Sequence, residues 1–353
     1  SSNITVSSNF ILNGGRIFDL SNTDIYMTGI GNLYISSTNA IKSLNIGAAA
    51  NVNILNLDNI SSSNLTLNGI LNTGGANIVT AGNFVLNAPA VLIGGNVKMT
   101  GATGNILSIS SGNILDSLLI TGSINMLTSN LPATTLQINN GLLQVSNDLS
   151  LLTGNIVIYN GGNLSGTSHS LVVSSNVFLG SSANLQFNEM TFSSGSNLSA
   201  IVNTDIFQLT GSNIILSEGS SLELATSVVK LSGVGNLSIS LGNVMGNVVI
   251  AGGANTYIGS ELSAKDLGIY GIFNTGSSNI NISRNFLLDS NGSIDALGGS
   301  HLYMTGTSGW IKFLSSTSNT LSDLTITAPA NITFASDITA GNVHIYGDVN
   351  SGN

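Results

Sequence analysis

The sequence contains no cysteine, so neither a disulfide framework nor a thiolate metal site is available to stabilise the chain. Charged residues make up only 7% of it, against about a quarter in an average soluble protein. Seven Lys and Arg stand against sixteen Asp and Glu, which excludes the basic stripe that nucleic-acid binding needs. No apolar run reaches the roughly 18 residues of a membrane-spanning helix, so we expect no transmembrane segment.

Proline is also rare, with three residues, and no segment keeps a 3.6-residue apolar period over three turns. We therefore expect no helices. Gly, Ser, Asn and Thr instead separate short stretches in which apolar residues alternate, such as Ile25-Tyr26-Met27 and Val229-Lys230-Leu231. Such alternation is typical of short β-strands with one buried side.

A longer repeat lies above the strands. Related segments begin at Asn9, Asn83, Asn155, Asn213 and Asn285, at similar intervals except for a shorter one between Asn155 and Asn213. The long intervals divide into four coils of roughly 18 to 19 residues, and the short interval lacks about one coil. The sequence thus predicts an all-β, parallel β-solenoid (β-helix) of about 19 coils, about 90 Å long at about 4.8 Å per coil, with no helical cap. A coil of this length suits a left-handed solenoid, whereas the uneven length of the coils favours a right-handed one.

We expect one continuous solenoid over residues 1–353. Its internal super-repeats lie at about 43–116, 117–189, 190–246, 247–321 and 322–353, and the last continues into 1–42 of a following unit.

The two ends of the sequence, when joined, match an internal segment. Ile345–Asn353 (IYGDVNSGN) followed by SSNITVSSNF from Ser1 resembles IYGIFNTGSSNINISRNF at 269–286, with one inserted residue. This indicates one period of something longer, made either of chains stacked head to tail or of repeats within a larger polypeptide. Both predict uncapped ends that pair with the next unit; the alternative is that a cap has been trimmed. The candidate assembly residues are Ile345, Tyr346, Val349 and Asn353 at one end and Ser1, Ile4 and Val6 at the other.

Candidate catalytic residues are scattered. Asp289 and Asp295, with Arg284 nearby, come nearest to the acid cluster of a polysaccharide lyase, but the aligned copies carry mostly neutral residues there, which favours a solvated corner. His169, His301 and His344 have no metal-ligand spacing, so we expect no metal and no cofactor. The sequence predicts a protein that is not an enzyme.

Two surface features remain open. Tyr26, Tyr303 and Trp310 are candidates for an outward aromatic strip that stacks on surface glycans, although exposed aromatics are often merely tolerated. Candidate N-glycosylation sequons begin at Asn3, Asn59, Asn64, Asn163, Asn197, Asn236, Asn281, Asn291 and Asn331.

Runs such as SDLTITAPANITF from Ser322 and NLTLNGILNTGG from Asn64 resemble β-helical surface adhesins, filamentous-haemagglutinin-like proteins and archaeal or bacterial surface-fibre solenoids. The resemblance implies an extracellular or cell-surface protein that forms fibres or mediates attachment. We expect a filament subunit or repeat whose main partner is itself, head to tail. The alternatives are an adhesin stalk with a glycan- or receptor-binding tip and, last, a polysaccharide-cleaving β-helix.

Overall fold

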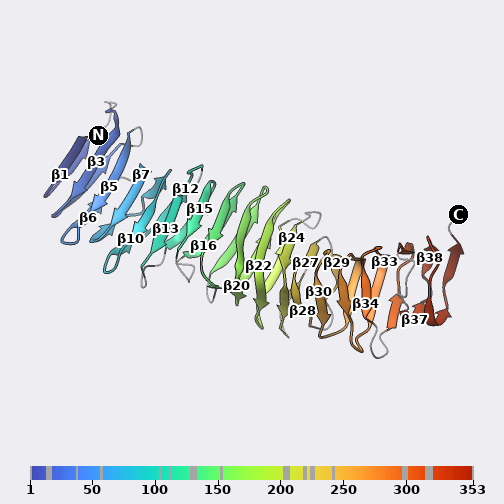
Figure 1. Ribbon diagram of the computed structural model, residues 1–353. Coiled ribbons are helices and arrows are strands. Elements are labelled where there is room, and N and C mark those ends of the chain that lie inside the picture. The colour runs from blue at the N-terminus through green and yellow to red at the C-terminus, as the bar shows by residue number, and fades with distance from the viewer. Residues whose placement is uncertain are drawn as a thin grey trace. The chain divides into compact units, whose positions relative to one another are not determined.

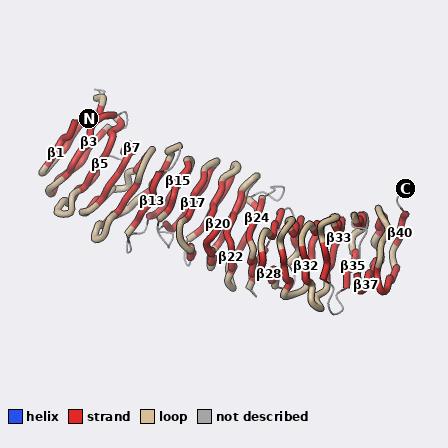
Figure 2. The backbone as a smooth tube through the Cα atoms, viewed as in Figure 1, coloured by secondary structure: helices blue, strands red, loops and turns tan. Residues whose placement is uncertain are grey.

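The computed structural model describes residues 2–12, 18–36, 39–55, 59–102, 105–110, 113, 115–127, 133–151, 154–201, 207–217, 221–222, 227–240, 243–295, 301–314 and 321–351. The chain divides into two compact units, Ser1–Gly166 and Thr167–Asn353. Strands joined by short turns run through both (Figures 1 and 2). The described residues form no helix, and so none long and apolar enough to cross a membrane.

Short parallel strands make up the first unit. They are β1 (Ser2–Val6), β2 (Phe10–Leu12), β3 (Leu20–Met27), β4 (Ile30–Ile35), β5 (Ala40–Ile46), β6 (Asn51–Ile54), β7 (Ile60–Leu67), β8 (Ile70–Asn72), β9 (Asn77–Thr80), β10 (Phe84–Leu86), β11 (Val91–Ile93), β12 (Asn96–Met99), β13 (Asn105–Ile109), β14 (Leu115–Ile120), β15 (Ser123–Met126), β16 (Ala133–Asn139), β17 (Leu142–Val145), β18 (Leu149–Leu151) and β19 (Asn155–Tyr159).

The division between the units falls within β20 (Asn163–Val173). The strands that follow it are β21 (Asn176–Leu179), β22 (Asn184–Phe192), β23 (Asn197–Ala200), β24 (Gln208–Gly211), β25 (Asn213–Leu216), β26 (Ser221–Leu222), β27 (Val228–Leu231), β28 (Val234–Ser238), β29 (Met245–Ile250), β30 (Asn255–Ile258), β31 (Leu262–Ile269), β32 (Ile272–Asn274), β33 (Ile280–Leu288), β34 (Ser293–Asp295), β35 (His301–Met304), β36 (Gly309–Phe313), β37 (Leu321–Ile326), β38 (Asn331–Phe334), β39 (Ala340–Ile345) and β40 (Asp348–Ser351).

Each turn of the chain lays strands on three faces. In the first unit, β3, β5, β7 and β10 stack on one face, and β4, β6, β8 and β11 stack on the next. On the third, Ile60 at the start of β7 pairs with Ile78 of β9, which pairs with Val97 of β12. Long strands such as β7 therefore bend round a corner, pairing with β9 before it and with β10 after it. This confirms the predicted all-β parallel solenoid.

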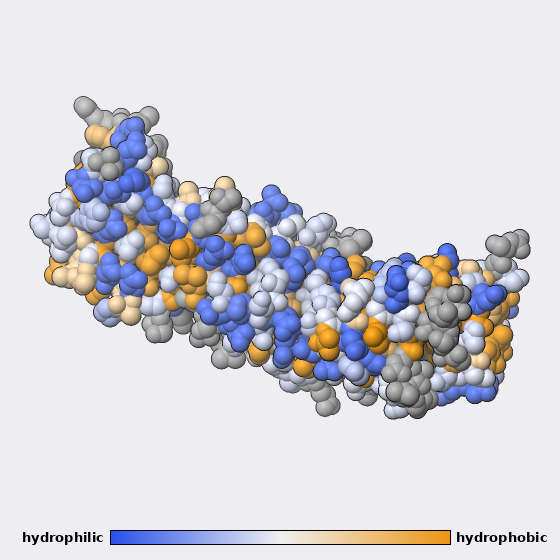
Figure 3. All heavy atoms as spheres, viewed as in Figure 1, coloured by the Kyte–Doolittle hydropathy of each residue, from blue (hydrophilic) through white to orange (hydrophobic). Residues whose placement is uncertain are grey.

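The core is a set of apolar columns that run along the stack. Ile25, Leu44, Leu65 and Phe84 are stacked on successive turns, and each is 0% exposed. Alternate residues point outward because successive side chains of a strand leave opposite sides. The outward residues are of both kinds, and polar and apolar residues are interspersed on the viewed side (Figure 3).

Asparagine side chains bind one another from turn to turn. The amide of Asn87 donates to Asn68 at 2.9 Å in the first unit, and that of Asn350 donates to Asn331 at 2.8 Å in the second. Such neutral ladders reinforce stacking, whereas stacked like charges would repel. This is a physical reason for the low charge of the chain.

The coil count predicted from the sequence was too high. The solenoid makes about 14 turns rather than 19. Among the described pairs, a short turn joins Thr256 to its stacked partner Phe273, and a long one joins Phe286 to Ile311. Corners of variable length make many turns longer than the coil that the sequence predicted.

The super-repeat does not contain four coils either. From Met27 the stack rises through Ile46 and Leu67 to Leu86, which is three turns, and the chain then lays β11 and β12 on two further faces to reach Met99. Leu231 leads to Met304 in the same way, through Ile250, Ile269 and Leu288 and then β34 and β35. Each of these two intervals thus covers three full turns plus two of the three faces of a fourth turn. Aligned residues such as Met27 and Met99 therefore lie on different faces.

Candidate functional site

Arg284, the basic residue of the candidate corner with Asp289 and Asp295, is engaged with a different carboxylate. At a corner of β33, Arg284 pairs with Asp266 on the preceding turn through two contacts, one of them Nε to Oδ1 at 2.8 Å. The hydrogen bond that Arg284 donates to this carboxylate, and the negative charge of the carboxylate, raise the pKa of Arg284. Asp289 Oδ1 accepts hydrogen bonds from the Ser290 hydroxyl at 3.3 Å and the Asn291 backbone N–H at 3.1 Å, as in an Asx-turn. The side chain of Asp295 lies outside the described residues.

A second charged corner joins turns in the first unit. Lys42 Nζ lies 3.0 Å from Asp24 Oδ2 one turn earlier. Hydrogen bonds from Lys42 and then from Ser43 lower the pKa of Asp24. Such pairs link stacked turns.

His301 and His344 have different neighbours. His301 Nε2 lies 3.3 Å from Asp323 Oδ2, and the His301 ring stacks on Tyr303 with centroids 5.8 Å apart. His344 pairs in the ladder with Thr325. Across the described ranges, no three His, Asp or Glu side chains are grouped closely enough to hold a metal ion.

Two of the three candidate residues for an aromatic strip lie on different faces. Tyr303 stacks in a column with Asn281 and Thr325, whereas Trp310 stacks with Asn285 and Thr333 on the following face. Tyr26, in the first unit, is 36% exposed. Tyr303 and Trp310 thus do not form one column on which a sugar chain could stack.

The sequons differ in accessibility. The asparagines exposed to solvent are Asn3, Asn59, Asn236, Asn291 and Asn331, and those half-buried are Asn64, Asn163, Asn197 and Asn281. Asn64 is engaged, because its Oδ1 accepts the backbone N–H of Asn83 at 2.9 Å. The exposed group is the better candidate for glycosylation.

The remaining candidate site is the end of the second unit, where one segment repeats an internal one. Residues 326–350, here called the terminal copy, align without gaps with residues 250–274, the inner copy, at an offset of 76. The corner serine (Ser260 and Ser336) and the tripeptide Ile-Tyr-Gly (269–271 and 345–347) are identical in both. The alignment therefore allows position-by-position comparison.

In both copies, the later residues stack on the earlier ones in the same way. The N–H of Tyr270 donates to the carbonyl of Ile250 at 2.8 Å, and Tyr346 donates to Ile326 at 2.8 Å. Likewise Ile272 donates to Ala254 and Asp348 to Ala330, both at 2.8 Å. The end of the second unit is thus an ordinary turn of the solenoid.

What differs is the cover. In the inner copy, β33 pairs with β31, and Leu267 and Ile269 are 1% and 0% exposed. Their counterparts in β39, Val343 and Ile345, are 48% and 51% exposed. Within the described part of the chain, no strand pairs with the outer edge of β39.

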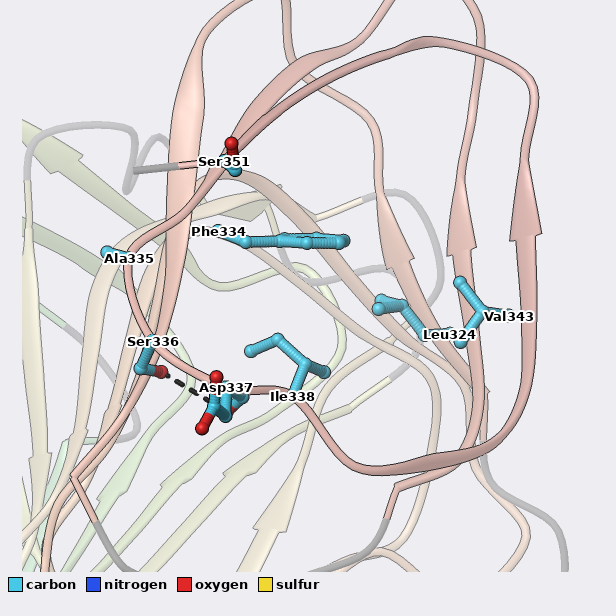
Figure 4. A pocket seen from close by; sticks show the side chains of 8 residues that line it. All are labelled: Leu324, Phe334, Ala335, Ser336, Asp337, Ile338, Val343 and Ser351. Atoms are coloured by element: carbon cyan, nitrogen blue, oxygen red, sulfur yellow. Dashed lines mark hydrogen bonds between the residues drawn. The ribbon is translucent and has the colours of Figure 1, made fainter. Parts of the chain in front are cut away.

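A cavity lined by both apolar and polar residues opens at this uncovered turn. It has a volume of about 410 Å³, and Figure 4 shows Phe334, Ile338, Leu324 and Val343 pointing into it. Ala335, Ser336, Asp337 and Ser351 complete its lining. The cavity lies at the uncovered end of the core. At the inner copy, side chains of the next turn such as Phe286 occupy the corresponding place.

Among the described residues of the first unit, β1 pairs with β3 and β2 with β4, and no strand pairs with their other edges. Ile4 and Val6 of β1 are half-buried, whereas Ile25 and Met27, their partners in β3, are 0% exposed. Ile11 and Phe18 are 51% and 41% exposed. Both ends thus present apolar strands.

The sequence predicted part of this site. Ile345 and Tyr346 are exposed, at 51% and 70%, and Val349 is half-buried, whereas Ser1 and Asn353 lie outside the described residues. Ile338, Val343, Phe10 and Phe18 were missed. The gap-free alignment of 250–274 with 326–350 is the signal that identifies the first two of them.

Comparison of the chain with protein-family models, with curated proteins and with solved structures finds no match in any of the three. The structure shares its fold with β-helical proteins in general. What this chain does must therefore be argued from its own surfaces.

Proposed function

We propose that this chain is a structural subunit or repeat of an extracellular or cell-surface filament, and that it elongates end to end by strand stacking. The observation that carries the proposal is the exposure of Val343 and Ile345, whose inner counterparts are buried under the next turn. An open strand edge beside exposed apolar side chains is a template for another strand. Monomeric solenoids usually avoid it with a polar cap.

The energetics favour concentration-dependent joining. Burial of a fully exposed Val or Ile side chain contributes about 1.5 to 3 kcal/mol. Val343 and Ile345 are 48% and 51% exposed, so cover by a second copy would add about half of that for each. Association costs on the order of 4 to 15 kcal/mol in lost translational and rotational freedom. The backbone pairs at the edge must supply part of the remainder.

The surface supports a structural role outside the cell. Asparagine amides bind across turns, as between Asn72 and Asn53 at 3.3 Å, and such ladders stabilise a stack of identical turns. An exposed sequon such as Asn291 is an accessible acceptor in a secreted protein.

The test is negative-stain electron microscopy of the purified chain over a hundredfold range of concentration, with rod length as the readout. We expect mean length to rise with concentration. Single short rods at every concentration would contradict self-assembly and favour the stalk of a longer polypeptide. Release of oligosaccharides from a polysaccharide panel would contradict the structural role.

A further inference from the structure

The inner copy reveals which sequence covers an edge of this kind. β33 (Ile280–Leu288) pairs with β31, and Ile294 of β34 pairs with Phe273 of β32. In that cover, Ile280, Phe286 and Leu288 are at most 2% exposed. A segment that covers the terminal copy should carry apolar residues at these spacings.

The first strands of this chain have that pattern. Asn279, Ile280, Ile282, Phe286, Leu288 and Ile294 correspond, at a constant offset of 276, to Asn3, Ile4, Val6, Phe10, Leu12 and Phe18. Each apolar position of the inner cover is apolar in the N-terminal segment. The match extends beyond β33, because Ile294 of β34 lies six positions after Leu288 and Phe18 lies six positions after Leu12.

Building on the proposed function, we infer a register for the contact between two copies of this chain. Ile4 and Val6 of the second copy lie over Ile338 and Ala340, because Ile280 and Ile282 lie over Leu262 and Ala264. Phe10 and Leu12 lie over Val343 and Ile345, as Phe286 and Leu288 lie over Leu267 and Ile269. Phe18 lies over Val349, as Ile294 lies over Phe273.

The cavity fits this register. The inner counterpart of Phe10, Phe286, is 0% exposed and contacts Phe313 with ring centroids 6.0 Å apart. At the terminal copy, Val343 forms part of the cavity of about 410 Å³ that Phe10 is placed to enter (Figure 4). An aromatic side chain in this open column removes the exposed apolar surface from water.

Backbone groups extend the match. In the inner copy, the N–H of Leu262 donates to the carbonyl of Asn279 at 3.0 Å, and the carbonyl of Ile269 accepts from Asp289 at 2.9 Å. The proposed register makes the N–H of Ile338 donate to the carbonyl of Asn3 in the second copy. The carbonyl of Ile345 accepts a backbone hydrogen bond from the second copy, as the carbonyl of Ile269 accepts one from Asp289.

Engineered cysteines test the register, since the chain has no cysteine of its own. In the inner copy, the outward neighbours Gly268 and Leu287 are paired, and their counterparts are His344 and Ile11. Paired residues of adjacent strands lie about 4.8 Å apart, within the Cα–Cα range of a disulfide. One preparation carries His344→Cys and the other Ile11→Cys, and the two are mixed and oxidised mildly.

The control pair is His344→Cys with Asn9→Cys, which also lies on the exposed side but two residues out of register. We expect at least about tenfold more disulfide-linked dimer from the Ile11 pair than from the Asn9 pair, because the control Cα atoms lie beyond about 7 Å. Equal or greater yield from the control pair overturns the register while end-to-end assembly stands. Rods in the microscope with neither pair linked also overturn the register. Absence of both rods and crosslinks overturns the proposed function together with it.

Discussion

Residues 250–274 and 326–350 have related sequences and equivalent internal hydrogen bonds, but opposite surroundings above. The inner copy is covered by β33 and β34, and Leu267 is 1% exposed. The terminal copy has no such cover among the described residues, and Val343 is 48% exposed. Sequence and local backbone alone therefore do not determine whether these apolar residues are core. Their position in the stack does.

The largest expected effect comes from placing a charge in each copy. We expect Leu267→Asp to lower the free energy of unfolding of the second unit by more than about 3 kcal/mol, because it buries a carboxylate without a partner. Val343→Asp should lower that free energy by no more than about 1.5 kcal/mol, because Val343 is already 48% exposed. Urea unfolding followed by circular dichroism at low protein concentration measures both. Equal losses would contradict the difference in burial.

The second prediction concerns assembly. Val343→Asp and Ile345→Asp should each prevent rods from lengthening, since the joined state would bury the carboxylate. Val244→Asp is the matched control, because Val244 is 47% exposed but lies away from the end strands β39 and β40. Sedimentation velocity should show larger species for wild type and for the control only. Assembly by Val343→Asp at wild-type concentrations would place the contact elsewhere.

A third substitution tests whether the two copies have the same support. A Cβ at Gly271 would lie 2.4 Å from the carbonyl oxygen of Ala251, and one at Gly347 would lie 2.3 Å from that of Ala330. Gly271→Ala should cost about 1 to 3 kcal/mol in unfolding, and Gly347→Ala should weaken assembly by a similar free energy. At Gly252, the nearest atom to such a Cβ lies 3.8 Å away, so Gly252→Ala is the control. A neutral Gly347→Ala would show that the terminal turn adjusts in a way the inner one does not.

The smallest effect is electrostatic. The inner copy has the Arg284–Asp266 pair, whereas the corresponding residues of the proposed contact are Ser8 and Asn342. Asp266→Asn should cost less than about 1 kcal/mol, because Arg284 is 57% exposed and such pairs are screened by salt. Unfolding at low salt and at about 1 M salt measures it. A loss that persists in salt would indicate a packing role for Asp266.

The fold was predictable because its signals are local. Alternation at Ile25 and Met27, and Gly-Gly corners such as Gly74 and Gly75, both with positive φ, required no knowledge of distant contacts. The coil count was not predictable, because it depends on how much of the chain each corner absorbs. The turn from Phe286 to Ile311 is longer than the turn beneath it, from Leu267 to Phe286.

The candidate site was half predictable for the same reason. Joining the two ends of the sequence identified Ile345 and Val349 as assembly residues. Ile338 and Val343 were missed because their role as assembly residues depends on the strand that covers them. That strand is identified by the pairing of their counterparts Leu262 and Leu267 with β33, one turn further along the chain. Phe10 was aligned with Phe286 in the sequence, but only the pairing of Phe286 with Leu267 gives Phe10 a partner.

Hydrogen exchange of the terminal copy tests the central claim most directly. Backbone amides of residues 336–346 are followed by mass spectrometry across protein concentrations, with those of residues 260–270 as the internal reference. We predict that the terminal amides exchange quickly in dilute solution and become as protected as the reference when the protein is concentrated. Terminal amides that exchange equally fast at all concentrations would contradict the claim that a second copy covers this edge.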